Sequence, residues 1–412
     1  MKTFVFLGIG GAGMRGLAFL LRENGDTVFG FDDDEANTEI NIEEAKEKLS
    51  YADQLVYTDA AVEDHPLRIA ARQAGVPELP YQTALGEFSK KYTTIAITGT
   101  HGKSSTTAFL AHICIENKLD PTVLIGASME TLPGKHARLG HSTYFIVEAD
   151  EYRKHFLELN PTHIIITSID FDHPDAFSSL EDVEHAYEEF MEKLKEGGTV
   201  TLPEHEKIAH PNMQFLKQTK TTNKKDIADI SAPLPGEHMN MNAALAIAVA
   251  EILGVSRQGA IDALKTFPGL ARRFELLGRH NGCDIRSDYG HHPAEIAATL
   301  AGARQVYPNS HIVAVFEAHM PLRLKTFFAD FVDALAGADE ISIVPPFVPA
   351  GRDNTALEDA LKLRDELIHK GKKANFHENP TDFLDTLTVE SVAILFSAGS
   401  LDLSVRKSVK KH

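Results

Sequence analysis

Two stretches of this sequence share one pattern: a short apolar run, a glycine-rich turn, and then apolar residues at helical spacing. The first is FVFLGIGGAGM at residues 4–14, and the second is TTIAITGTHGKSS at residues 93–105. A buried strand that turns through glycines into a helix is typical of an α/β sheet of the doubly wound kind. Strand and helix patterns alternate along the rest of the chain, so the sequence predicts an α/β fold with parallel sheets throughout.

Glycine and proline divide this alternation into three parts. The segment from Gly75 to Pro80 separates the first part from the strand at residues 93–98, and a third part begins near Pro268. We therefore expect an N-terminal Rossmann-like domain, a central P-loop ATPase-like parallel sheet and a C-terminal Rossmann-like α/β domain, at residues 1–88, 89–267 and 268–412. The polar segment 203–225 is interpreted as loop or weak edge structure.

Charge and cysteine content exclude several classes of protein. The formal net charge of −18 argues against binding to nucleic acid or to anionic lipid, although a small anionic ligand can still be held locally. Cys114 and Cys283 have no metal-ligand spacing and form no disulfide framework. No run approaches the ~18 apolar residues of a membrane span. The apolar run at the N-terminus is soon interrupted by glycines, and no signal-peptide cleavage site follows it. We expect a cytoplasmic protein without nucleic-acid or membrane partners.

The second glycine loop carries the strongest local signal for chemistry. Its backbone amides and the start of the following helix face an anion, Lys103 adds a point charge, and Ser104 offers a hydroxyl to Mg²⁺. The strict P-loop spacing requires glycine where this chain has Ile97, so the loop is a shortened variant. A plain glycine turn with a solvated lysine is the alternative. The predicted phosphate-binding residues are Gly99, Thr100, His101, Gly102, Lys103, Ser104 and Ser105.

The first glycine loop and an acidic cluster are weaker signals. The loop residues Gly8, Gly10, Gly11, Ala12 and Gly13, with Asp32 after the second strand, suit a nucleotide diphosphate, but tight packing also explains such glycines. EADEY at residues 148–152 and DFDHPD at residues 170–175 each follow a predicted strand. Because the carboxyl ends of parallel strands meet at one edge, we expect Glu148 and His173 to be ligands for Mg²⁺ rather than solvated turn residues.

Three further motifs are ambiguous on their own. In PGEHMNMNA, Asn242 opens the predicted helix, and an N-cap is the simpler role for it. RRFE contains Arg273, and an arginine pair usually means surface charge. DYGHHP contains Asp288 and His291, and a histidine pair alone indicates nothing.

Together, in this order, the motifs GIGGAGM, TGTHGKSS, EADE, DHPD, PGEHxxxNA, RRFE and DYGHHP resemble the Mur ligase family, and its alanine-adding branch most. The resemblance runs from Phe4 to Phe396. It implies a domain for a UDP-sugar, a central ATPase domain and a domain that closes and brings an amino acid. It also implies that the carboxylate of UDP-N-acetylmuramate attacks the γ-phosphate of ATP, and that the amine of L-alanine then attacks the acyl phosphate.

The resemblance also assigns roles to individual residues. Lys103 and Ser104 match the phosphate-loop lysine and the Mg²⁺ hydroxyl, and Glu148 and His173 match the metal-side carboxylate and histidine. The other matched positions are His238 and Asn242 near the nucleotide, Arg273 on phosphate, Asp288 as a ribose or metal-side acid, His291 on the acceptor side, and His319 and Arg323 on the amino-acid carboxylate. Positioned cations of this kind are what phosphoryl transfer requires.

The chain departs from the family pattern at Met239 and Met320, which replace an asparagine and an arginine, and its central domain is short. Glu188 stands where other branches carry a lysine. Three alternatives remain: a recycling ligase that attaches a tripeptide to the same sugar nucleotide, a nicotinamide-dependent oxidoreductase, and a UDP-sugar-binding relative without catalysis. The sequence leaves open whether the protein is a monomer or a homodimer.

Overall fold

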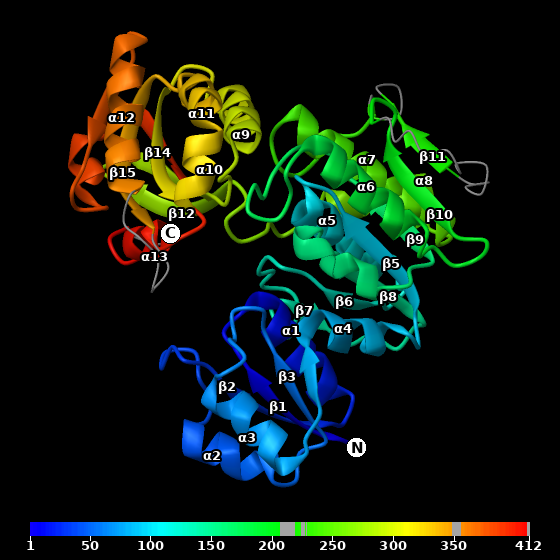
Figure 1. The fold of residues 1–412 in the computed structure, drawn as a ribbon. Coiled ribbons are helices and arrows are strands. Elements are labelled where there is room, and N and C mark those ends of the chain that lie inside the picture. Colours follow the sequence, from blue (N-terminus) through cyan, green and yellow to red (C-terminus); the bar gives the residue numbers. More distant parts are fainter. Residues whose placement is uncertain (207–218, 224–226, 228, 348–355, 410–412) are drawn as a thin grey trace. The chain divides into compact units, whose positions relative to one another are not determined.

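The structure, a computed structural model, describes residues 1–206, 219–223, 227, 229–347 and 356–409. Within these residues the strands form three sheets, each with its own helices (Figure 1). The α/β class predicted from the sequence is confirmed. By contacts the chain divides into two compact units: the first holds residues 1–169, 183–230 and 242–268, and the second holds residues 170–182, 231–241 and 269–412.

The first sheet is parallel and has the strand order β2-β1-β3-β4. Its strands are β1 (Thr3–Leu7), β2 (Thr27–Phe31), β3 (Gln54–Tyr57) and β4 (Glu78–Pro80), and its helices are α1 (Ala12–Glu23), α2 (Ile42–Leu49), α3 (Pro66–Ala74) and α4 (Tyr81–Ser89). Helix α1 buries Leu17, Leu20 and Leu21, the residues whose spacing predicts it. Asn41 starts α2 with a capping box that includes Glu44.

The second sheet has the order β11-β10-β9-β5-β8-β6-β7. Its strands are β5 (Thr93–Thr98), β6 (Thr122–Leu124), β7 (Ala137–Arg138), β8 (Tyr144–Glu148), β9 (His163–Ile166), β10 (Thr199–Pro203) and β11 (Thr219–Thr222). The helical elements that follow these strands are α5 (Lys103–Glu116), η1 (Tyr152–Glu158, a 3₁₀ helix), α6 (Leu180–Met191), α7 (Glu237–Ile252) and α8 (Arg257–Leu264). Since β5 lies between β8 and β9, the loops that follow these three strands share one edge.

The segment 203–225 is only partly described. Within it, β11 pairs in parallel with β10 at the edge of the second sheet, in agreement with the weak edge structure expected there. Residues 207–218 and 224–225 of this segment lie outside the described residues.

The third sheet has the order β12-β13-β17-β14-β15-β16. Its strands are β12 (Glu275–His280), β13 (Cys283–Asp288), β14 (His311–His319), β15 (Glu340–Phe347), β16 (Lys373–Phe376) and β17 (Ser391–Phe396). The helices are α9 (Pro293–Val306), α10 (Pro321–Thr326), α11 (Phe328–Leu335), α12 (Ala356–His369), α13 (Leu401–Arg406) and the 3₁₀ helix η3 (Asp382–Thr386). The sequence pattern from Leu324 to Leu335 predicts one helix, but the structure has two, which meet at Phe327.

Both faces of the third sheet are covered, which explains why its central strands are apolar without alternation. In β14, Ile312, Ala314 and Phe316 pack in one core cluster, together with Leu335 and Leu363 from helices α11 and α12. Val313 and Val315, which point the other way, pack in a second cluster with Phe383 and Leu401. A strand buried on both faces reads as a continuous hydrophobic run.

The expectation of parallel sheets throughout is wrong at two edges. Strand β7 pairs antiparallel with β6, and β12 pairs antiparallel with β13. The β12–β13 pair is a hairpin whose two turn residues, Asn281 and Gly282, both have positive φ (50° and 87°). Asn-Gly is the preferred sequence for such a turn, so the local signal for an antiparallel hairpin was present in the sequence.

Within the described ranges, no helix is both long enough and apolar enough to cross a membrane.

Candidate active site

The glycine loop between β5 and α5 lies against the segment that follows β9, at the edge of the second sheet. Gly99 has φ of +136°, and a Cβ there would lie 2.0 Å from the hydroxyl of Thr167. The amides of Thr100 and His101 donate to the carbonyl and the hydroxyl of Ser168, at 3.0 and 2.9 Å. The backbone of this loop is therefore fixed by the segment that follows β9.

The start of α5 fits a phosphate group. Its N-cap, Gly102, has no side chain to satisfy the first-turn amides, which are natural anion donors. In the same turn, the hydroxyl of Ser105 is buried and has no hydrogen-bond partner among the described residues. Both observations suit an anionic ligand such as the phosphates of a nucleotide.

The side chain of Lys103 is 16% exposed, and its ammonium group has three acceptors in and beside the loop. Its Nζ donates to the carbonyls of Gly99 (2.6 Å) and Thr100 (3.2 Å) and to Oε1 of Glu151 (2.9 Å). Burial opposes the charged form, but the carboxylates of Glu151 and Asp150 outweigh it and raise the pKa of Lys103. Burial also raises the pKa of Glu151 to about 7, although Lys103 opposes that shift. The lysine thus keeps its positive charge.

Ser104 and Glu148, two of the predicted metal ligands, lie in contact. The hydroxyl of Ser104 donates to Oε1 of Glu148 at 3.0 Å, and the other carboxylate oxygen accepts from the amide of Gly126 at 2.9 Å. Hard oxygen ligands beside a phosphate loop are the donor set that Mg²⁺ prefers. These residues therefore fit the ion. Glu148 belongs to the first unit and His173 to the second.

Asn242 has a role other than the one its position in the sequence suggests. Helix α7 already begins at Glu237, so the interpretation of Asn242 as an N-cap is wrong. Asn242 is buried, and a Cβ on Gly102 would lie 2.7 Å from its side-chain oxygen. The asparagine therefore packs against the phosphate loop. The sequence pattern places the start of α7 too late, because the polar residues after the Pro235-Gly236 turn resemble a loop. In the structure this turn, where Gly236 has φ of +112°, leads directly into the helix.

The first glycine loop is braced by Asp32. One carboxylate oxygen accepts from the amide of Gly10 at 2.7 Å, and the other accepts from the amide of Asp34 at 3.0 Å. Gly11 is the N-cap of α1, so Ala12 and Gly13 form the first turn of this helix. A helix start of this kind fits a diphosphate, and the position of Asp32 is explained at least in part by loop geometry.

In the second unit, Arg273 lies in a tight turn whose neighbours Arg272 and Phe274 have φ of +57° and +49°. Its guanidinium carbon lies 5.5 Å from the ring centroid of Tyr289, and its Nη1 is 3.9 Å from Glu295. Its Nε is buried without a hydrogen-bond partner in the described part of the chain. This arrangement suits an anionic ligand such as phosphate.

Asp288 supports that turn. It is buried at the end of β13 and accepts from the amides of Phe274 and Gly290, both at 2.9 Å. Burial raises the pKa of Asp288, and Arg273 counteracts the shift. Its contacts therefore hold the backbone directly after Arg273 and directly before the histidines at residues 291 and 292.

Arg323 has a partner that the sequence does not identify. Its Nε and Nη2 donate to the two oxygens of Asp172 at 2.9 and 3.2 Å, and both side chains are at most 5% exposed. Burial raises the pKa of Asp172, but Arg323 and His173 outweigh it and hold that pKa well below its usual range. The remaining Nη1 lies 3.8 Å from the sulfur of Met320, itself at φ of +64°.

Two predicted acceptor-side histidines lie near each other in the same unit. The ring centroids of His291 and His319 are 6.2 Å apart, and His319 stacks on Phe347. Nδ1 of His291 is 3.0 Å from the carbonyl of Tyr289. Burial lowers the pKa of His291 to about 4, so the imidazole is neutral near pH 7.

His238 lies elsewhere in this unit, in the first turn of α7 against Gly236.

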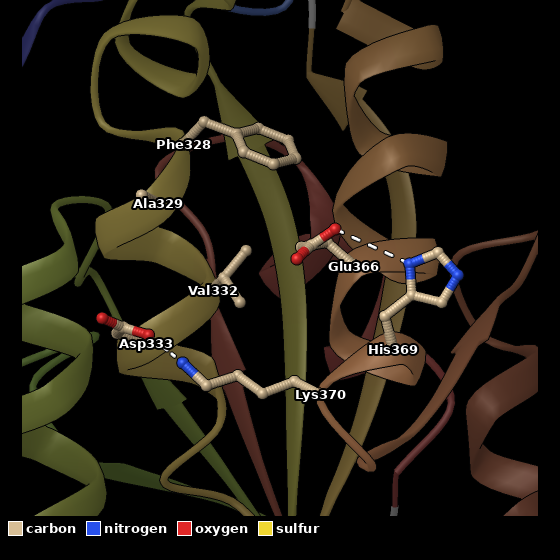
Figure 2. A pocket seen from close by; sticks show the side chains of 7 residues that line it. All are labelled: Phe328, Ala329, Val332, Asp333, Glu366, His369 and Lys370. Carbon is tan, nitrogen blue, oxygen red and sulfur yellow. Dashed lines mark hydrogen bonds and ion pairs between the residues drawn. The ribbon is translucent and has the colours of Figure 1, made fainter.

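A surface hollow between α11 and α12 lies apart from these motifs. Figure 2 shows its lining, which includes an ion pair between Asp333 and Lys370 and a contact of 3.7 Å between Glu366 and His369. None of the candidate site residues lines this hollow. The candidate active site is therefore the set of motifs described above.

The fold and these contacts define a phosphate-loop α/β protein with three sheets. Sequence profiles of three domains match in order: the Mur ligase family catalytic domain at residues 3–93, the Mur ligase middle domain at 97–224, and the Mur ligase glutamate ligase domain at 272–400. The chain belongs to the Mur ligase family of ligases.

Individual relatives are similar over almost the whole chain. A UDP-N-acetylmuramate–L-alanine ligase of Clostridium acetobutylicum is 34% identical and covers 91% of this chain and 90% of its own length. The crystal structure of a UDP-N-acetylmuramate–alanine ligase from Thermotoga maritima has a TM-score of 0.78 at 25% identity, over 99% of this chain and 98% of that chain. A murein peptide ligase from Psychrobacter arcticus has the same fold, with a TM-score of 0.71 at 21% identity over the full length of both chains.

Proposed function

We propose that this chain is an ATP-dependent ligase that joins L-alanine to the lactyl carboxylate of UDP-N-acetylmuramate. The observation that carries the proposal is the charged, partly buried Lys103 in its glycine loop, with the Ser104–Glu148 pair beside it. The activity for which the relatives are named, at 34% identity over nine-tenths of the chain, supports the choice of substrates.

The reaction divides into two steps. The lactyl carboxylate takes the γ-phosphoryl group of ATP, which releases ADP, and the amine of alanine then displaces phosphate to form the amide. Lys103 and Arg273 place positive charge around the transferring group, which is the main requirement of phosphoryl transfer. Mg²⁺, held by Ser104, Glu148 and His173, would neutralise phosphate charge.

We assign the sugar nucleotide to the domain at residues 1–88, where the amides at the start of α1 face its diphosphate. The central domain, residues 89–267, takes ATP. The domain at residues 268–412 takes the amino acid beside His319 and Arg323. Asp172, from the segment after β9, occupies the Nε and Nη2 edge of the Arg323 guanidinium, which leaves Nη1 for the acceptor's carboxylate.

Phosphate release in the presence of ATP and UDP-N-acetylmuramate tests this function. It should depend on the amine, with L-alanine preferred over glycine and L-serine. Release only with the L-alanyl-γ-D-glutamyl-diaminopimelate tripeptide would assign the chain to peptide recycling instead. No release with any of these acceptors would refute the ligase proposal.

A further inference from the structure

Glu151 is one of three acceptors around the ammonium group of Lys103. An ammonium group has three N–H donors, and here they meet Gly99, Thr100 and Glu151. A phosphate oxygen that binds this lysine must therefore replace one of these three acceptors. Which one yields is decided by how firmly each is held.

The two carbonyl acceptors belong to the loop itself and are held in place. Thr100 is tied through its amide to Ser168, and the hydroxyl of Thr167 binds the carbonyl of Thr98 at 3.1 Å. Glu151 comes from a different segment, which follows β8 and leads into η1. Its side chain is buried, at 2% exposure, but its carboxylate can move by rotation about side-chain bonds, whereas withdrawal of either carbonyl would require rearrangement of the loop backbone.

We propose that Glu151 is a positioning residue, which holds Lys103 in the loop before the nucleotide binds and then yields the ammonium group to a phosphate oxygen. The inference rests on the proposed function only in taking the anion to be a nucleoside phosphate. Glu151 acts through Lys103 and touches no reacting atom.

The exchange has a cost that can be measured. A carboxylate beside the lysine repels the incoming phosphates, and like charges a few ångströms apart in a partly buried site interact strongly. Removal of this charge should therefore strengthen nucleotide binding. It should also leave Lys103 less firmly oriented, which slows turnover because phosphoryl transfer depends on the position of that charge. Binding and turnover should thus change in opposite directions.

The test compares Glu151→Gln with Glu151→Asp. The glutamine variant keeps the size of the side chain but not its charge. At pH 8, above the pKa of about 7 of Glu151, the dissociation constant of ADP, measured by calorimetry without sugar or amino acid, should therefore fall about three- to tenfold. Its kcat should fall about tenfold. The aspartate variant keeps the charge but is one methylene shorter, so kcat should fall while the affinity for ADP stays the same.

Glu189→Gln is the matched control, because Glu189 pairs with Lys154 at 2.7 Å on the surface of the same unit. It should change neither ADP affinity nor kcat. Unchanged or weaker ADP binding by Glu151→Gln would overturn the inference, and if that variant fails to fold, an unchanged kcat in Glu151→Asp would do so. Wild-type protein that binds no ADP would instead refute the proposed function.

Discussion

At the scale of single residues, Lys103 is the side chain on which the proposed chemistry depends most. We expect Lys103→Ala to lower turnover by several powers of ten, because the charge that meets the transferring phosphoryl group is lost. The fold should persist, since Glu151 has a pKa of about 7 and can take up a proton when its partner is removed. Phosphate release and thermal unfolding measure the two effects.

Lys154→Ala is the corresponding control, because this lysine pairs with Glu189 in an exposed position. It should retain normal turnover. A Lys103→Ala protein with more than about a tenth of wild-type turnover would contradict the phosphate-loop assignment, because one oriented donor alone is worth about 10²–10³ in kcat.

Arg323 and Asp172 form a buried ion pair whose loss should be costly. Arg323→Ala leaves a carboxylate without its partner, which typically destabilises a fold by about 3–5 kcal/mol. Asp172→Ala in the same chain removes that orphaned charge, so the double variant should lose less than the sum of the single variants. Chemical denaturation of the four proteins measures this coupling. Additive losses would mean that the two side chains do not interact in solution.

The acceptor role of Arg323 is tested separately. In Arg323→Lys the positive charge remains but the planar fork is lost, and a charged hydrogen bond to the alanine carboxylate is worth about 1.5–3 kcal/mol. The KM for L-alanine should then rise roughly ten- to a hundredfold, while the KM values for ATP and the sugar nucleotide move little. An unchanged KM for L-alanine would assign its carboxylate to other residues.

The sequence predicted which residues stand at strand ends, but not all of their partners. Lys103, Ser104 and Glu148 are recognisable because strand, glycine loop and helix fix their positions locally. Glu151 and Asp172 were within quoted motifs, yet no pattern indicates that they pair with Lys103 and Arg323, which are distant in sequence. Such pairs depend on tertiary contacts, which the structure shows and the sequence pattern does not.

At the scale of elements, strands that precede the glycine loops were predicted almost to the residue. The apolar runs at residues 3–7 and 93–98 predict strands with the bounds that β1 and β5 have, because buried β-branched and aromatic runs between turns are distinctive. Strands β12, β13 and β16 were not expected. Their sequences mix charged and apolar residues, as in ELLGRH and CDIRSD, and the Asn281-Gly282 turn between β12 and β13 was the signal that was overlooked.

That turn gives a prediction for stability. Gly282 has φ of +87°, where a side chain is strained, while the nearest atom to an added Cβ is an ordinary 3.5 Å away. Gly282→Ala should therefore lower the free energy of unfolding by about 1–2 kcal/mol through backbone strain alone. Asn281→Gly should change it less, because glycine accepts positive φ. Thermal or chemical unfolding that finds Gly282→Ala as stable as wild type would contradict the hairpin geometry.

At the scale of the whole molecule, the three sheets correspond to the three predicted parts of the chain. The domain boundaries at residues 88 and 267 remain a prediction from the positions of glycine and proline in the sequence. Contacts divide the chain differently, because residues 170–182 and 231–241 associate with the third sheet. Both segments are short, and their sequences contain no apolar pattern that would indicate which sheet they pack against. Their association could not be predicted, since it depends on contacts such as the one between Asp172 and Arg323.

The whole molecule also contains two glycine loops, and the requirement for a metal ion distinguishes what they do. If the first loop bound a nicotinamide cofactor, activity would depend on that cofactor and not on ATP. The proposed ligase instead places a hydroxyl and a carboxylate, Ser104 and Glu148, beside a phosphate loop, and such oxygen ligands favour Mg²⁺ or Mn²⁺.

We expect EDTA to abolish phosphate release, either ion to restore it, and NAD or NADP to have no effect. Glu148→Gln should raise the Mg²⁺ concentration needed for half-maximal rate, whereas Glu189→Gln should not. Full activity in EDTA would exclude the metal site, and tight NAD binding without ATP hydrolysis under any combination of substrates would favour an oxidoreductase.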